Sequence, residues 1–185
     1  MTRLEMKKKV LGMIEELNPN SEMLTDDPDI ATKYTEVENQ VMFELARTKK
    51  IPKYVERLVS KGDTITFEDL EGDVGNAIYQ IGMVSGVDFT TRANGTVLKI
   101  LSDGTVEIDV YVYPERITEK TSMNYEYELS PDVLEIMPYG IAADLLKSDV
   151  SAEYGTVYHT RYKELLQMLD PRYQMNFITI EGGVM

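Results

Sequence analysis

Apolar residues recur at helical spacing through the first third of the chain. The strongest run steps by 4, 3, 4 and 4 residues and comprises Ile30, Tyr34, Val37, Val41 and Leu45. Such spacing predicts an amphipathic helix, which Asp27 and Pro28 begin and which ends near Lys50, before a second proline. An earlier helix is predicted over residues 4–17 and a shorter helical segment over residues 54–59.

The middle third changes to strand spacing. Between residues 106 and 113 aliphatic side chains alternate with acidic and aromatic ones, which predicts a strand with one buried face. The dipeptides Asn94-Gly95 and Asp103-Gly104 are strong turn signals because both residue types tolerate a positive φ. The pattern therefore predicts a three-stranded antiparallel meander over residues 87–113, with weaker strand signals before it.

Helical spacing returns in the last third. Ser130 and Pro131 supply a helix start, and Pro138 is expected to kink or break the helix that follows. A second helix carries one stripe of apolar and aromatic side chains, namely Tyr154, Val157, Tyr158, Tyr162, Leu165 and Leu169. Beyond Pro171, residues 177–180 form a strand-like segment with no neighbour in sequence with which to pair.

These elements predict a mainly α fold with a β insertion, of the α+β class. The order is N-terminal helices, an antiparallel meander, two C-terminal helices and a strand-like tail. We expect a single domain over residues 1–185, with a helical core from residues 1–61 and 130–170. The acidic β insertion would cover about residues 63–115 and a C-terminal arm residues 171–185.

The charge of the chain argues against nucleic-acid binding. Nineteen Lys and Arg residues stand against 32 Asp and Glu residues, a net charge of −13. Residues 62–130 carry 4 basic and 13 acidic groups, a net of −9. Such a surface repels phosphates, so we expect no sequence-specific nucleic-acid partner. The charge alone would also suit a small acidic inhibitor that mimics DNA, provided that its carboxylates were spaced like phosphates. No stretch approaches the roughly 20 apolar residues that cross a bilayer, so no membrane partner is expected.

The residues that catalysis and metal binding favour are scarce. The chain has no Cys and a single His, His159, which falls on the last predicted helix. The acidic run at Asp26, Asp27 and Asp29 lacks the glycine that a calcium-binding loop requires, and a helix start accounts for it. The sequence contains no nucleophile, phosphate-binding or dinucleotide motif. We therefore expect no enzyme activity, no catalytic residues, no cofactor and no metal site.

Tyrosine is enriched, with 12 Tyr residues against 4 Phe and no Trp. Four of these residues alternate in or near the predicted meander: Tyr111, Tyr113, Tyr125 and Tyr127. Tyrosine is common at protein interfaces because its ring is apolar and its hydroxyl is polar. The four side chains therefore fit a subunit interface or the finishing of a half-buried sheet, and the sequence leaves both interpretations open.

The C-terminal third carries a resemblance to a known family. The run from Asp132 to Asp149, DVLEIMPYGIAADLLKSD, is followed by spaced tyrosines at Tyr154 and Tyr158 and by the segment 161–166, RYKELL. Together with the Tyr-x-Tyr-Pro exit of the meander at Pro114, this resembles the head–tail connector (adaptor, or neck ring) proteins of tailed bacteriophages. The resemblance covers most of the chain by layout and residues 131–168 by pattern.

The resemblance implies a structural virion protein of the neck, made in the host cytoplasm. Such adaptors form a ring of about twelve copies beneath the portal protein, extend the DNA channel and dock a tail or further neck protein. Two hypotheses accompany it. The arm residues Phe177, Ile178 and Ile180 would add to a sheet edge of the portal, and Glu107 and Asp109 would line the channel and repel DNA. A tail-completion or collar protein is the alternative within the same particle.

Overall fold

The computed structural model describes residues 1–148 and 152–169, and their fold belongs to the α+β class, as predicted. The helices are α1 (Arg3–Met13), α2 (Pro28–Lys49), α3 (Phe67–Val74), α4 (Pro131–Leu145) and α5 (Ala152–Met168), with short 3-10 turns at Ala93–Gly95 and Leu146–Ser148. The strands are β1 (Ile51–Val59), β2 (Thr64–Thr66), β3 (Ile78–Ser85), β4 (Phe89–Arg92), β5 (Val97–Ile100) and β6 (Gly104–Val112).

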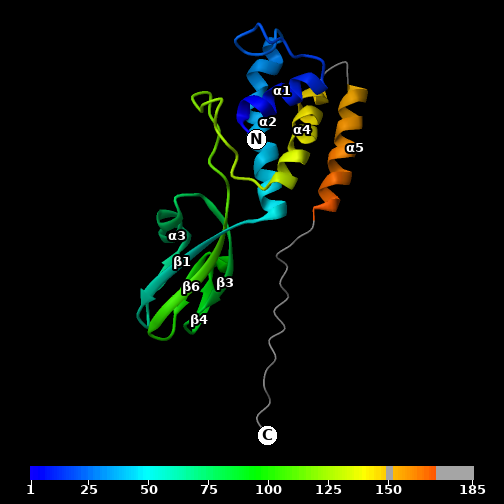
Figure 1. The fold of residues 1–185 in the computed structure, drawn as a ribbon. Coiled ribbons are helices and arrows are strands. Elements are labelled where there is room, and N and C mark those ends of the chain that lie inside the picture. Colours follow the sequence, from blue (N-terminus) through cyan, green and yellow to red (C-terminus); the bar gives the residue numbers. More distant parts are fainter. Residues whose placement is uncertain (149–151, 170–185) are drawn as a thin grey trace.

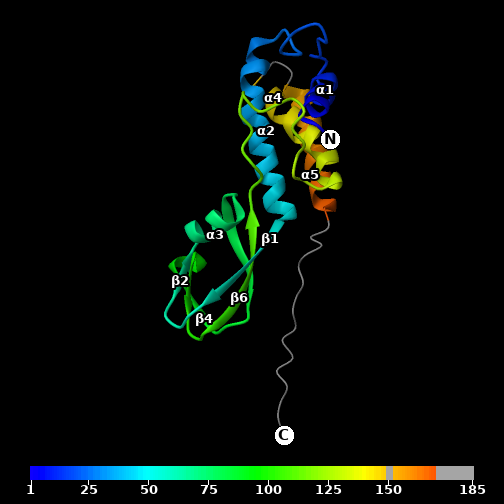
Figure 2. The same ribbon diagram turned by 60° about the vertical axis from the view of Figure 1, so that its left-hand side comes forward.

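The chain forms two lobes end to end. Helices α1, α2, α4 and α5 gather at one end, and the strands with α3 gather at the other (Figures 1 and 2). We call residues 1–50, 114–148 and 152–169 the helical lobe and residues 51–113 the β lobe. Helix α2 runs the length of the helical lobe and continues into β1. The chain returns to the helical lobe after β6, so these two connections join the lobes. Each lobe has its own hydrophobic core, and Ile51 packs against both.

Helices α2 and α4 begin at the residues that the sequence predicts. The Asp27 carboxylate accepts bonds from the backbone N–H groups of Asp29 and Ile30, and Pro28 is the first residue of α2. Pro131 likewise opens α4. Helices α2, α4 and α5 approach closely at Gly140, where a Cβ atom would lie 2.8 Å from Val41 Cγ1 and 2.9 Å from the Tyr162 ring. No larger residue fits there without displacing one of the two neighbouring helices.

A buried polar network holds the loop of residues 114–130 against α1 and α2. The Arg3 guanidinium bonds Glu38 at 3.1 Å and the backbone carbonyl oxygens of Thr118 and Thr121 at 3.2 and 3.0 Å. Asn39 donates to the Ile117 carbonyl oxygen and accepts from the Ile117 N–H, both at 2.8 Å. Because burial disfavours a charged carboxylate, the pKa of Glu38 is raised despite the Arg3 and Tyr127 partners.

The β lobe contains two three-stranded antiparallel sheets, ordered β1-β6-β3 and β2-β5-β4. Strand β6 is central in the first sheet, and its alternation places Val106, Ile108, Val110 and Val112 in the core. The chain passes from one sheet to the other at Gly86, whose φ is +89°. A Cβ atom there would lie 2.1 Å from the Thr105 carbonyl oxygen, so only glycine allows this approach of the two segments.

The predicted meander is wrong in its pairing, although the hairpin at Asn94-Gly95 is confirmed. Strands β4 and β5 pair across it, with φ values of +57° and +86° at the two turn residues. Strand β6, however, pairs with β1 and β3 and not with β5. After Asp103 the chain changes sheet instead of turning back, because β6 completes the sheet begun by β1. The Asp103-Gly104 dipeptide allows the chain to change direction, but it does not specify the strand with which β6 pairs.

The helix predicted over residues 54–59 is wrong, and of the kink or break expected at Pro138 the break is wrong. Residues 54–59 form part of strand β1 and not a helix, so the helical core ends near residue 50 and the β insertion begins at Ile51. Tyr54 and Leu58 point to one face of the sheet and Val55 and Val59 to the other, so apolar residues on both faces imitate helical spacing. Pro138 does not break α4, which runs through it from Pro131 to Leu145. Burial of both flanking turns, including Met137 and Ile141, stabilises the helix there.

Candidate functional surfaces

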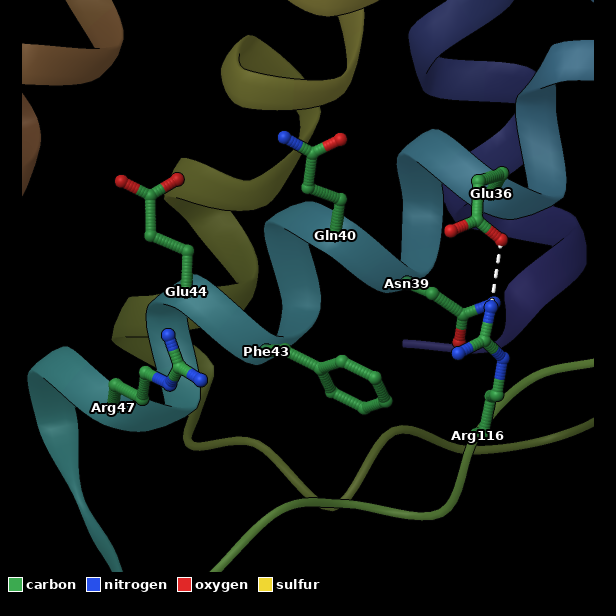
Figure 3. Close-up of a pocket in the computed structure, with 7 residues that line it drawn as sticks. All are labelled: Glu36, Asn39, Gln40, Phe43, Glu44, Arg47 and Arg116. Carbon is green, nitrogen blue, oxygen red and sulfur yellow. Dashed lines mark hydrogen bonds and ion pairs between the residues drawn. The ribbon is translucent and has the colours of Figure 1, made fainter. Parts of the chain in front are cut away.

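An open cleft of about 530 Å³ lies beside α2. Figure 3 shows the ring of Phe43 between the guanidinium groups of Arg47 and Arg116. Arg116, from the loop after β6, pairs with Glu36 at 2.7 Å, and Arg47 bonds the hydroxyl of Tyr113. The two cations of the cleft therefore already have partners, and its lining carries both signs of charge, so it favours no ligand of one charge.

An aromatic cluster joins the two lobes at the end of α2. The Tyr113 ring centroid lies 5.1 Å from that of Phe43 and 4.9 Å from that of Tyr79. The Tyr79 hydroxyl donates to the Ala46 carbonyl oxygen of α2 at 3.1 Å, and burial raises its pKa to about 12. Lys50 Nζ lies 4.5 Å from the Tyr111 ring centroid. We call these contacts the inter-lobe joint, because they link α2 to β3 and β6.

The four tyrosines predicted at a subunit interface therefore occupy two separate places. Tyr111 and Tyr113 are half-buried and belong to the inter-lobe joint. Tyr127 is 7% exposed and donates its hydroxyl to Glu38, which leaves almost no surface for a second subunit. The half-buried Tyr125 packs edge-on against Tyr127 with its ring centroid 5.6 Å away. Burial, followed by the nearby carboxylates Glu128 and Glu115, raises the Tyr125 pKa to about 12.

Glu107 and Asp109 lie on the outer face of the β1-β6-β3 sheet, the face turned away from the core of the β lobe. In the register of the sheet Glu56 of β1 stands opposite Glu107, and Tyr54 stands opposite Asp109. Tyr54 is 56% exposed, and Leu58 on the same face is 86% exposed. The acidic residues predicted to line a DNA channel thus share their face with exposed apolar side chains. Their role in a channel stays a prediction.

Helix α5 presents a second surface at the other end of the molecule. Its buried side packs on α4 through Gly155, Tyr162 and Leu169. About 100° around the helix are Tyr154, Val157 and Met168, which are 69%, 64% and 73% exposed. The ion pair of Arg161 with Glu164, at 3.1 Å, lies among them. We call Tyr154, Val157, Arg161, Glu164 and Met168 the α5 stripe, since they repeat at intervals of three and four residues.

The remaining predictions can be located only in part. The arm residues Phe177, Ile178 and Ile180 lie outside the described residues. His159 is exposed on α5. Within residues 1–148 and 152–169, no three His, Cys, Asp or Glu side chains are grouped so that they could hold a metal ion. No helix in the same ranges combines the length and the apolar composition that a membrane span requires.

Sequence reasoning missed both the Glu56–Leu58 part of the outer sheet face and the Arg3–Glu38 pair. The sequence does not reveal the Glu56–Leu58 part of the face, because the spacing of residues 54–59 predicts a helix and not strand β1. The second joins residues 35 positions apart, and no local pattern indicates such a contact. Comparison with known proteins adds no assignment: no protein-family model matches the chain, and neither does any curated protein.

Proposed function

We propose that this protein is a head–tail adaptor, a structural subunit that forms a ring below the portal of a tailed phage particle. The observation that carries the proposal is the α5 stripe, in which the exposed side chains of Tyr154, Val157 and Met168 flank one ion pair. The stripe lies on the C-terminal helix pair, whose sequence resembles the adaptor family. A ring of identical copies needs two different surfaces on each subunit. The α5 stripe supplies one of them, with a second copy as its occupant.

The layout of the chain supports this proposal. The resemblance at residues 131–168 falls on α4 and α5, which pack against α2 through Gly140. The helical lobe is therefore a bundle that could repeat around an axis, while the β lobe projects from the end of α2 (Figure 1). The net charge of −13 would keep such subunits apart from DNA and from one another until they assemble.

The hollow beside the stripe offers a place for the neighbouring copy. About 390 Å³ of open space lies between the end of α1 and the start of α5, lined in part by Ile14, Leu146 and Tyr154. Since Tyr154 belongs to both the hollow and the α5 stripe, the two surfaces adjoin. A helix of the adjacent subunit could bury the stripe and enter this hollow, as ridges pack into grooves.

The proposal is tested by co-expressing the chain with a portal protein from the same phage. Native mass spectrometry then counts the copies that purify with the portal. We expect several copies per portal ring. Val157→Asp should reduce the number sharply, because a carboxylate would be buried without a partner at the contact. The matched control is Gln167→Asp, which places the same charge at an exposed position of α5 outside the stripe.

Two results would overturn the proposal. One is a wild-type chain that never purifies with the portal and is absent from particles. The other is an equal loss of copies in both variants, which would show that charge and not the α5 stripe controls assembly. Circular dichroism of each variant separates a failure to assemble from a failure to fold.

A further inference from the structure

The outer face of the β1-β6-β3 sheet is uncovered although it carries large apolar side chains. Strands β1 and β6 are each nine residues long and pair along their whole length. One face of the pair is buried by the core of the β lobe, whereas Tyr54 and Leu58 on the other face are more than half exposed. Leu58, the penultimate residue of the edge strand β1, is 86% exposed, so its side chain gains little from burial in this chain.

The same face concentrates carboxylates that form no ion pair with any residue that the structure describes. Lys50 lies over the Tyr111 ring at one end of the face, and Glu107 accepts a hydrogen bond from the Ser85 hydroxyl at 3.1 Å. Glu56 stands directly opposite Glu107 across the two strands, an arrangement that is unfavourable for two like charges. Among the described residues, neither of them nor Asp109 forms an ion pair. Partial burial, followed by the charges of Glu107, Glu56 and Asp109, raises the pKa of the Tyr54 hydroxyl.

The negative charge of the outer sheet face favours some classes of binding partner over others. Phosphate backbones and anionic lipid headgroups would be repelled, which disfavours nucleic acid and membranes. A second copy docked symmetrically on the same face would oppose carboxylates to carboxylates, which also disfavours a two-fold dimer through it. A protein segment that carries both cations and apolar side chains would neutralise the three acids and cover Tyr54 and Leu58.

We propose that the outer face of the β1-β6-β3 sheet is a docking surface for a protein segment in which Lys or Arg residues alternate with apolar side chains. The segment would place its cations between Glu56 and Glu107 and its apolar side chains on Tyr54 and Leu58. The repulsion between the two glutamates lowers the stability of the free protein. Binding of a cationic segment relieves this repulsion and so increases the affinity of the complex. This inference does not depend on the adaptor proposal.

A synthetic ten-residue peptide in which Lys and Val alternate serves as the probe, and the same peptide with Glu in place of Lys is its control. Affinity is measured by fluorescence anisotropy at physiological salt, and the site is mapped by amide chemical shifts on the full chain. We expect only the Lys peptide to bind, with shifts confined to β1, β6 and their turns. Leu58→Ser should weaken it, and Glu56→Gln with Glu107→Gln should weaken it about tenfold.

The matched control is Glu68→Gln with Asp88→Asn, which removes two exposed carboxylates from the same lobe outside this face. Affinity should be unchanged in this variant. An equal loss in both double variants would show only general attraction to an acidic protein and would overturn the proposal. So would shifts that map to the helical lobe, or self-association of the free chain that Leu58→Ser abolishes, since a second copy would then be the occupant.

Discussion

The helical lobe buries charged and polar side chains in its core, whereas the core of the β lobe is aliphatic throughout. Arg3, Lys7, Glu38 and Asn39 are each at most 5% exposed, and all four belong to the helical lobe. The buried members of the β-lobe core are Val, Ile and Leu only. In the β lobe, carboxylates gather instead on the outer face of a sheet.

The difference shows two ways of fixing one arrangement of the chain. Helices pack in several registers of similar energy, and a buried polar network favours the one register that satisfies all its groups. In the helical lobe that network also fixes the loop of residues 114–130. In the β lobe the alternation of buried and exposed positions sets the register of the strands, because a slip of one residue would turn the buried side chains outward. An apolar core is therefore sufficient there. The two lobes should therefore respond differently to substitution.

Loss of Arg3 should give the largest effect. Arg3→Met leaves the buried Glu38 carboxylate without its cation, and removing one partner of a buried pair costs about 3–5 kcal/mol of unfolding free energy. Replacing both residues, as Arg3→Met with Glu38→Met, should recover part of this loss because no buried charge remains. Chemical denaturation of the wild type and the two variants measures these changes in unfolding free energy. A double variant as unstable as the single one would mean that the loop contacts of Arg3 dominate.

A glycine substitution tests the β lobe at its backbone. Gly86→Ala should destabilise the protein by about 2–3 kcal/mol, since it combines a strained φ with a Cβ placed against a carbonyl oxygen. Gly95→Ala is the control, because its φ of +86° is close to the +89° of Gly86 but nothing lies within 4 Å of its Cβ position. The control should lose only the strain, about 1 kcal/mol. Equal losses would contradict the close approach of residues 86 and 105.

The inter-lobe joint should give a smaller effect. Tyr79→Phe removes the hydroxyl that bonds the Ala46 carbonyl oxygen but keeps the ring on Tyr113. The expected loss is about 1 kcal/mol, the value of one hydrogen bond. Hydrogen exchange should show the increased opening at the end of α2 and in β3. An increase confined to the tips of the β lobe would argue against a joint at this residue.

The ion pair of Asp132 with Lys49 should make the unfolding free energy depend on pH in the acidic range. The bond to Lys49 is the main reason that the pKa of Asp132 falls to about 2, against about 4 for an unfolded chain. The contribution of the pair is therefore present above about pH 4 and is lost as the pH falls through 2. Asp132→Asn should melt at a lower temperature than the wild type at pH 7, and the difference should vanish near pH 2. A difference that grows in acid would contradict the pairing.

A substitution on the outer sheet face should change the unfolding free energy least, and it should raise stability where the other substitutions lower it. Glu56→Gln removes one of two like charges that face each other across β1 and β6. Unfolding free energy should rise by a few tenths of a kcal/mol, up to about 1. The increase should fade at high salt, because salt screens exposed charges. Lower stability in the variant would mean that Glu56 has a stabilising partner in the free protein.

The sequence was sufficient to predict elements whose cause is local. The helix starts at Asp27-Pro28 and Ser130-Pro131, the five-residue stripe of α2 and the hairpin at Asn94-Gly95 all depend on neighbouring residues, and all are confirmed. The Ser130 side chain, however, makes no capping hydrogen bond. The alternation of β6 also gave its buried face correctly. In each case the physical cause operates within a few residues, so a local pattern is enough to reveal it.

Pairing over long distances could not be predicted in this way. Strands β1 and β6 are separated by 44 residues in sequence between Val59 and Gly104, the pair that closes their ladder, and nothing local marks them as partners. The misassigned β1 hid half of the outer sheet face, so Glu107 and Asp109 were found without Glu56 and Leu58. Tyr127 was taken for an interface residue because sequence cannot distinguish a tyrosine bonded to a buried Glu38 from one at the surface.

The central claim is that this chain is a ring subunit of the particle neck, and the most direct test is its copy number in purified virions. Quantitative mass spectrometry would compare this chain with the major capsid protein of the same particles. The adaptor proposal predicts about a dozen copies per particle. Absence from the virion would contradict it, and a copy number far from that of a neck ring would assign the chain another role in the particle.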